Sequence, residues 1–316
     1  MLLRLTIPTV LRYCAVLVGL FVHALSAQAL HIYIVFDAKG EPKNASLLDR
    51  VEMHIKYRFH ESTTSVITSL PAIAPPTHTD DGDQIIVSLG NESLQWLSQS
   101  SFNLSTIAIF INRSSFTEYS RRYFSDGQIT AIFSDPSIFR QLALIRALYG
   151  NNTTVGYFVR DNTGDIDTIV DYSRQIGLSI KQLRYQNQTV AANLVNGIDV
   201  LLLQNDRRLF SRISLDDLLY ITYDLNNTGI VGYSSGLVKS GAVATTYHGL
   251  DDILGALQKS LHHFVKTGSL PTPSYPETYR LLSNKYVIRS LGISDPQDDK
   301  IIDFIDRHHQ RKESRR

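Results

Sequence analysis

The chain has 316 residues, of which 43% are hydrophobic and 19% charged, and its formal net charge is +1. This length is sufficient for two domains with sizeable cores, and the composition is typical of a globular protein. A net charge so close to zero gives no electrostatic footprint for nucleic acid. The basic run at residues 308–316 is interpreted as a solvated terminus.

The N-terminal residues have the pattern of a secretory signal. Arg4 and Arg12 supply positive charge, an apolar run follows, and residues 27–29 (Ala-Gln-Ala) fit a cleavage site. We therefore expect residues 1–29 to be a signal peptide that directs the protein to the periplasm; an uncleaved membrane anchor is the alternative. Cys14 is the only cysteine. The mature chain would have none, which excludes disulfides, cysteine-ligated zinc and a thiol nucleophile.

Strands and helices alternate through the first part of the chain. Runs rich in β-branched and aromatic residues predict strands at residues 31–36, 65–70, 84–89, 106–111 and 129–133. Apolar residues at helical spacing predict helices at residues 46–60, at 116–124 and around Leu94 to Leu97. Asn91 or Ser93 is expected to cap the helix around Leu94 to Leu97. Residues 71–82 are expected to form a proline-rich loop. This alternation implies right-handed crossovers and a parallel sheet.

The alternation then repeats in the second part. Strands are predicted at residues 155–159, 178–185, 199–203 and 279–287, and helices at 137–148, 165–176, 190–195, 215–225, 250–266 and 301–308. Pro136 begins the first of these helices, with Asp135 as the expected N-cap. The residues alone allow either two α/β lobes or a single large α/β domain.

Residues 229–247, GIVGYSSGLVKSGAVATTY, are predicted to form a strand, a polar turn, one helical turn and a second strand. Gly236 and Gly241 lie where the backbone must turn tightly. Ser234 and Ser235 follow the carboxyl end of the first strand, where open α/β sheets bind ligands.

This stretch resembles the signature G-S-S-E-G-L-V-K-A-G-A-L-A-S-Y of the substrate-binding proteins of ABC transporters, a family that includes aromatic amino acid binders. Blocks at residues 133–136, 141–145, 155–158 and 261–271 are also similar to that family. The resemblance extends from about Ser134 to Leu291. Ser235 stands where the family usually has an acidic residue, so the resemblance implies nothing about the ligand group that this acid would hold.

The resemblance implies an α/β fold with two doubly wound parallel-sheet lobes, as in type I periplasmic binding proteins, joined by a hinge of several crossings. The first lobe would comprise residues 30–135 and 248–272, and the second 136–247 and 273–300. Residues 301–316 would form a C-terminal helix and a basic tail. The chain would cross between the lobes near Ser134, Tyr247 and residues 271–276, and hinge motion would enclose the ligand.

Candidate ligand-binding residues lie at strand carboxyl ends and helix starts, where free N–H groups receive a carboxylate. They are Asp37, Asn91, Asn112, Ser134, Asp135, Asn205, Tyr233, Ser234, Ser235, Gly236 and Tyr247. Each has a structural alternative: the serines, asparagines and Asp135 are ordinary helix caps or turn residues, and the two tyrosines fill a hinge core as readily as they stack on a ring.

The sequence contains no G-x-S-x-G elbow, and its adjacent histidine pairs do not share a helix face. We therefore expect no catalysis, no metal and no cofactor. The predicted function is a monomeric, periplasmic solute-binding protein of an ABC-type uptake system. It would enclose a small polar ligand, with an amino acid favoured, and present it to a membrane permease. The alternatives are a receptor that signals to a membrane sensor and a secreted hydrolase.

Overall fold

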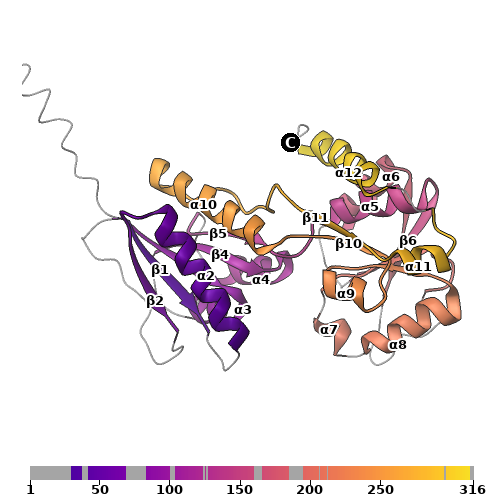
Figure 1. Cartoon of the computed structure of the whole chain (residues 1–316), viewed down its shortest axis with the longest axis horizontal. Coiled ribbons are helices and arrows are strands. Elements are labelled where there is room, and N and C mark those ends of the chain that lie inside the picture. The colour runs from indigo at the N-terminus through magenta and orange to yellow at the C-terminus, as the bar shows by residue number, and fades with distance from the viewer. Residues whose placement is uncertain are drawn as a thin grey trace, which may run out of the picture.

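The structure is a computed structural model. It describes residues 30–37, 42–68, 83–99, 104–123, 125, 127–159, 166–184, 195–205, 207–211, 213–294 and 297–313. The expected signal peptide, the 71–82 loop and most of the expected 190–195 helix lie outside these residues. Figure 1 shows two α/β lobes side by side along the long axis, connected by extended segments of chain.

The first lobe is built on a five-stranded sheet with the order β2-β1-β3-β4-β5, in which every pair is parallel. Its strands are β1 (His31–Phe36), β2 (Thr63–Ile67), β3 (Gln84–Leu89), β4 (Ser105–Ile111) and β5 (Ile129–Phe133). All six residues of β3 are buried, because the central strands of a parallel sheet are covered on both faces.

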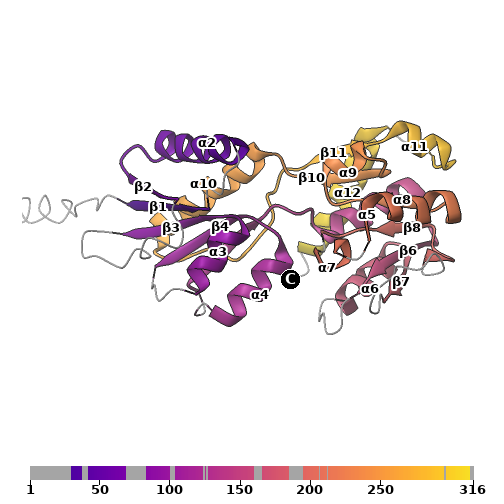
Figure 2. The same cartoon turned by 90° about the horizontal axis from the view of Figure 1, so that it is seen from below.

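Four helices cover this sheet: α2 (Pro42–Arg58), α3 (Gly90–Ser98), α4 (Arg113–Tyr123) and α10 (Leu250–Thr267). Helices α2 and α10 pack on one face through residues such as Ile55 and Leu257, whereas α3 and α4 contribute Leu94 and Phe116 to the other. Helix α10 therefore packs as part of the first lobe (Figure 2). In the amino-acid sequence, however, it follows every strand of the second sheet except β11.

The second lobe has a six-stranded sheet in the order β11-β10-β9-β8-β6-β7. Its strands are β6 (Thr153–Phe158), β7 (Leu178–Leu183), β8 (Val200–Leu202), β9 (Gly229–Val231), β10 (Ala244–Tyr247) and β11 (Arg280–Ser283). Only β11 is antiparallel to its neighbour. Strands β6 to β10 thus repeat the spatial order of β1 to β5.

Four helices pack on one face of this sheet: α5 (Ile138–Tyr149), α6 (Ile166–Gln175), α11 (Lys285–Ser290) and α12 (Asp298–Glu313). The other face carries α7 (Arg207–Phe210), α8 (Leu215–Leu219) and α9 (Ser235–Lys239). Ile301 and Ile305 of α12 are fully buried in the same cluster as α5. The C-terminal helix is therefore an integral part of the second lobe.

Three segments connect the lobes. They lie between β5 and α5, between β10 and α10, and between α10 and β11. In the third segment, Ser274 forms a parallel bridge to Ile132 at the edge of the first sheet before the chain enters β11 of the second. The final crossing is thus paired with strands of both lobes.

Several boundaries differ from the sequence-based predictions. The first long helix begins at Pro42, the helix expected over 215–225 is α8 followed by a π-helical turn η2 (Tyr220–Asp224), and the final strand ends at Ser283, where Asn284 caps α11. The predicted caps Asn91 and Ser93 were wrong: α3 starts at Gly90 without a side-chain cap, and Ser93 donates its hydroxyl to the Leu89 carbonyl. Among the described residues, no helix combines the length and apolar composition needed to cross a bilayer.

Candidate functional site

Both sheets have the doubly wound order 2-1-3-4-5, with a topological switch point between the first and third strands of each lobe. Asp37 and Asn91 follow β1 and β3, so they flank the switch point of the first lobe. Asn205 follows β8 at the equivalent point of the second lobe and is exposed. The crevice at a switch point is where open α/β sheets bind ligands, which makes these edges the candidate site.

Asn112 and Asp135 lie together at the carboxyl ends of β4 and β5. The Asn112 side-chain oxygen accepts the Ser115 N–H at 2.7 Å, and an Asp135 carboxylate oxygen accepts the Arg113 N–H at 3.1 Å. The prediction that Asp135 caps its own helix was wrong, because the N-cap of α5 is Ser137. Two free N–H groups of α4 are therefore occupied by the protein itself and are not open to a ligand carboxylate.

Burial raises the pKa of Asp135 from 3.8 to about 6, although the Arg113 N–H and guanidinium act in the opposite direction. Tyr275, from the third crossing, is hydrogen-bonded to the Arg113 side chain, and burial together with the Asp135 charge raises the pKa of its hydroxyl. An acid, a guanidinium and a phenol from three separate segments thus meet at the hinge edge of the first lobe. A carboxyl group with so perturbed a pKa is a functional-site candidate.

His248, in the second crossing, lies beside this group. Its ring stacks on Tyr275 at 6.4 Å between centroids, and Tyr275 contacts Phe133 at 4.9 Å. Nδ1 of His248 donates to the Thr278 carbonyl at 2.9 Å, while Nε2 is buried without a partner among the described residues. Burial lowers the pKa of His248 to about 4, so the ring is neutral at pH 7.

The backbone at the end of β4 is irregular. Phe110 has a φ of 56°, and the β4–β5 register shifts between Ile109 and Ile111. A bulky residue in the left-handed region is rare, and bulges next to active sites re-aim the residues that follow. Here the bulge comes directly before Asn112 and Arg113. A run of β-branched residues carries no signal for such a bulge, so the sequence does not predict it.

In the second lobe, Tyr233 and Ser234 lie between β9 and α9, and Ser235 and Gly236 are the first two residues of α9. The Ser234 hydroxyl accepts the Leu237 N–H at 3.3 Å and caps α9, which is its predicted structural alternative. Tyr233 is half-buried and meets Phe210 of α7 edge-on at 5.9 Å. Burial raises its pKa. Ser235 is half-buried, and Gly236 is exposed.

The remaining candidates lie close to the crossings. Ser134 follows β5 and donates its N–H to the Ile111 carbonyl, and Tyr247 ends β10 opposite Arg280 of β11. Both are half-buried. The structure therefore brings Asn112, Ser134 and Asp135 together at one lobe and Tyr233 to Gly236 together at the other.

Two buried polar residues of α5 fix the hinge and were not among the predicted site residues. Arg140 donates twice to the Pro276 carbonyl at 3.1 Å and lies over the Tyr279 ring at 4.9 Å. Gln141 donates to the Gly232 carbonyl at 2.7 Å and accepts the Thr246 N–H at 3.1 Å. A polar pair on a helix whose other residues are mostly apolar is the signal that could have identified them.

The arrangement offers little for catalysis. The nitrogen of His248 that a hydrolase triad would direct to an acid is bonded to a main-chain carbonyl instead. Within the described part of the chain, no group of three or more histidine, cysteine, aspartate or glutamate residues is placed to hold a metal ion. The side chains at the two sheet edges are suited to hydrogen bonding, charge pairing and ring contacts.

The sequence matches no protein-family model and no curated protein. Solved structures are similar to this chain at 14–15% identity. A ligand-free, open substrate-binding protein with adhesive properties from Clostridium difficile aligns with a TM-score of 0.59 over 85% of this chain and 97% of that one, at 14% identity. An ABC domain from Streptococcus pneumonia, solved in complex with L-Trp, aligns with a TM-score of 0.55 over 85% and 96%, at 15% identity.

A conserved domain protein from Vibrio cholerae is similar as well, with a TM-score of 0.52 over 85% of this chain and 96% of that one, at 14% identity. At such low identity the similarity defines the fold. The chain has the two-lobed α/β fold of type I periplasmic binding proteins, as the resemblance in residues 134–291 implied.

Proposed function

We propose that this protein binds a small polar solute between its two lobes and serves an ABC-type uptake system. The observation that carries the proposal is the position of polar and aromatic side chains at the carboxyl edges of both parallel sheets, next to three chain crossings. A site divided in this way between two lobes is completed by hinge closure.

An amino acid is the ligand class that the side chains favour. The Asp135 carboxyl group lies buried at the edge of the first sheet, and its pKa of about 6 indicates that neighbouring groups compensate its negative charge poorly. An ammonium group of a ligand would therefore stabilise the charged form of Asp135. Arg113 lies beside it and suits a ligand carboxylate. In the second lobe, Tyr233 and Phe210 offer apolar ring surface to the side chain of such a ligand. This assignment differs from the sequence-based prediction that helix N-termini hold the ligand carboxylate. In α4, two of the N-terminal N–H groups already bond to Asp135 and Asn112.

Thermal unfolding in the presence of single amino acids, sugars and nucleosides tests the proposal. A compound present at one hundred times its dissociation constant adds about 2.7 kcal/mol to the free energy of unfolding, which raises Tm by several degrees. We expect L-tryptophan, L-tyrosine or another amino acid to raise Tm. The same compound should lose its effect in Tyr233→Ala and Asp135→Asn, and keep it in Tyr286→Ala, which alters a side chain 83% exposed on α11. No shift with any compound would contradict solute binding.

A receptor that signals to a membrane sensor is the second candidate. It would use the same candidate site and the same hinge, so ligand binding does not distinguish the two. Uptake of the identified compound by cells with and without the gene does: loss of uptake supports transport, and unchanged uptake with a changed transcriptional response supports signalling.

A further inference from the structure

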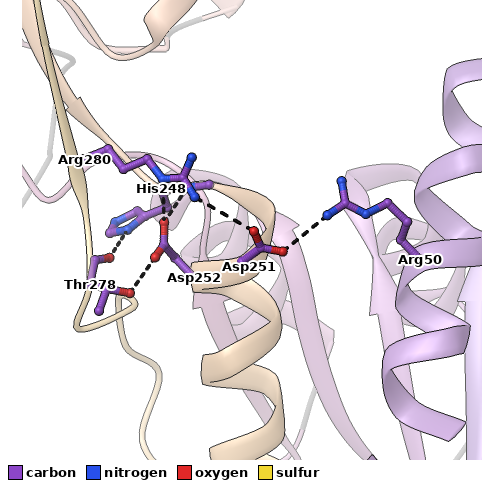
Figure 3. A network of polar contacts seen from close by, with 7 residues as sticks. Arg50, His248, Asp251, Asp252, Thr278 and Arg280 are labelled. Atoms are coloured by element: carbon purple, nitrogen blue, oxygen red, sulfur yellow. Dashed lines mark hydrogen bonds and ion pairs between the residues drawn. The ribbon is translucent and has the colours of Figure 1, made fainter. Parts of the chain in front are cut away.

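A chain of ion pairs crosses from one lobe to the other beside the hinge (Figure 3). Asp251 and Asp252 form the first turn of α10, which packs on the first sheet. Arg280 is the first residue of β11, which belongs to the second sheet. Its guanidinium lies 3.9 Å from Asp251 and 3.7 Å from Asp252. These contacts therefore join residues whose positions are set by different lobes.

Asp252 is held firmly in place. One carboxylate oxygen accepts the Gly249 N–H at 2.7 Å, and the other accepts the Thr278 hydroxyl at 2.6 Å. Only 14% of its side chain is exposed. Because Gly249 lies in the second crossing and Thr278 in the third, this one carboxylate fastens both crossings to the start of α10.

Asp251 is shared between two arginines. Arg50 of α2 approaches one of its oxygens to 3.2 Å, and Arg280 approaches the other from the opposite side. Arg50 and Asp251 both move with the first lobe, so Arg50 orients the carboxylate toward the arginine of the second lobe. Gly249 leaves room for that arginine, since a Cβ at this position would lie 2.8 Å from the guanidinium carbon of Arg280.

We propose that Arg280, Asp251 and Asp252 form an ionic latch that holds the two lobes in the arrangement seen here and so sets the equilibrium between lobe arrangements. A hinge rotation changes the distances between Arg280 and the two aspartates, whereas each lobe's own packing is preserved. Exposed ion pairs are individually weak, but a weak preference is enough to change a two-state ratio about two- to fivefold. The latch rests on the two-lobe fold and not on the identity of any ligand.

Single-molecule energy transfer between dyes on the two lobes tests the latch without a ligand. The full chain with Cys14→Ser has no cysteine, so Tyr57→Cys on α2 and Tyr286→Cys on α11 provide one label site on each lobe, at side chains 77% and 83% exposed. We expect Arg280→Gln to change the ratio of the two transfer populations about two- to fivefold at low salt. Wild type in 1 M NaCl should approach the variant, because the screening length falls to about 3 Å.

Arg174→Gln is the matched control. It removes an exposed arginine–aspartate pair of 3.2 Å that lies within α6, and it should leave the distribution unchanged. Asp251→Asn should shift the distribution in the same direction as Arg280→Gln, and the double variant should shift it by less than the sum of the two. The proposal is overturned if Arg280→Gln and Arg174→Gln give the same distribution, or if the effects of Arg280→Gln and Asp251→Asn add fully.

Discussion

The two lobes share the strand order 2-1-3-4-5 and differ in what borders the fifth strand. In the first lobe, β5 is bordered by a single bridge residue, Ser274. The Ser274 N–H donates to the Ala131 carbonyl, and the Phe133 N–H donates to the Ser274 carbonyl. In the second lobe, β10 receives a full antiparallel strand, β11, over four residue pairs. The same stretch of chain supplies both partners.

This difference indicates which lobe carries the hinge. The third crossing is held to the second lobe by the pairing of β11 with β10 and by Arg140, which donates to the Pro276 carbonyl. Its main-chain pairing with the first lobe is one bridge. Its other contacts with that lobe are made by side chains: Tyr275 with Phe133 and Arg113, Thr278 with Asp252 at 2.6 Å, and Glu277 with Lys259 at 2.5 Å. We infer that the crossing follows the second lobe through its main-chain pairing, and that a hinge motion changes the side-chain contacts that it makes with the first lobe.

The largest expected effect comes from the polar anchor of the second lobe. Gln141→Leu keeps the side-chain volume but leaves the Thr246 N–H buried without its acceptor. We expect a loss of about 3 kcal/mol in the free energy of unfolding, measured with urea. Gln175→Leu, at an exposed position of α6, is the control. Equal losses for the two variants would contradict an anchoring role for Gln141.

Two hinge residues are expected to give opposite dependences on pH. The folded pKa of Asp135 is raised from 3.8 to about 6, so its contribution to stability is full below pH 3.8 and lost as pH rises through 6. The folded pKa of His248 is lowered from 6.5 to about 4, so its contribution is present above pH 6.5 and lost as pH falls through 4. The two trends offset each other in the wild type.

Single variants should reveal these trends. Asp135→Asn should make stability rise with pH between 4 and 6.5, and His248→Gln should make it fall, each by about 1–3 kcal/mol over this window. Denaturant unfolding at pH 4, 5, 6 and 7 measures both, with Asp171→Asn as an exposed control. A wild-type slope preserved in both variants would contradict the assigned pKa shifts.

A smaller effect is expected where the crossing meets the first lobe. Ser274→Pro removes the N–H that bonds to Ala131, at a cost of about 1 kcal/mol in the free energy of unfolding. Thr272→Pro serves as the control, since the Thr272 N–H donates no main-chain hydrogen bond among the described residues. A loss as large as that of Gln141→Leu would show that the first lobe grips the crossing as firmly as the second, and would break the comparison.

The smallest expected effect is a gain. The Tyr149 hydroxyl is buried in the second lobe without a hydrogen-bond partner among the described residues, and burial raises its pKa. Tyr149→Phe removes this uncompensated group and should stabilise the protein by up to about 1 kcal/mol, seen as a small rise in Tm. Destabilisation by Tyr149→Phe would reveal a partner for this hydroxyl.

Much of the fold was predictable because strand runs such as HIYIVF and QIIVSL have a strong local pattern, and parallel order follows from their alternation with helices. The equivalence of the two sheets was not visible, since strand order is set by packing and not by residue type. Helix α10 illustrates this: its amphipathic pattern predicts a helix, but nothing local tells which lobe it covers.

The candidate site was predictable only in outline. Strand ends identified Asn112, Asp135 and the segment from Tyr233 to Gly236, which do lie at the sheet edges. The contacts that decide their chemistry are long-range. Asp135 bonds to a residue 22 positions away, and Tyr275 reaches Arg113 from the third crossing. A sequence pattern carries no trace of such pairs, so the cap assigned to Asp135 was wrong and Arg113 was overlooked.

Helix α10 also has a consequence for how the chain matures. Its Ile253, Leu254, Leu257, Leu261 and Phe264 complete the hydrophobic core of a lobe whose sheet ends at residue 133. During synthesis, that apolar face stays uncovered until more than a hundred further residues, including nearly all of the second sheet, have been made. The first lobe therefore cannot complete its core until α10 has been made, and the second lobe cannot do so until α12 follows, so both lobes remain incomplete while most of the chain is being synthesised.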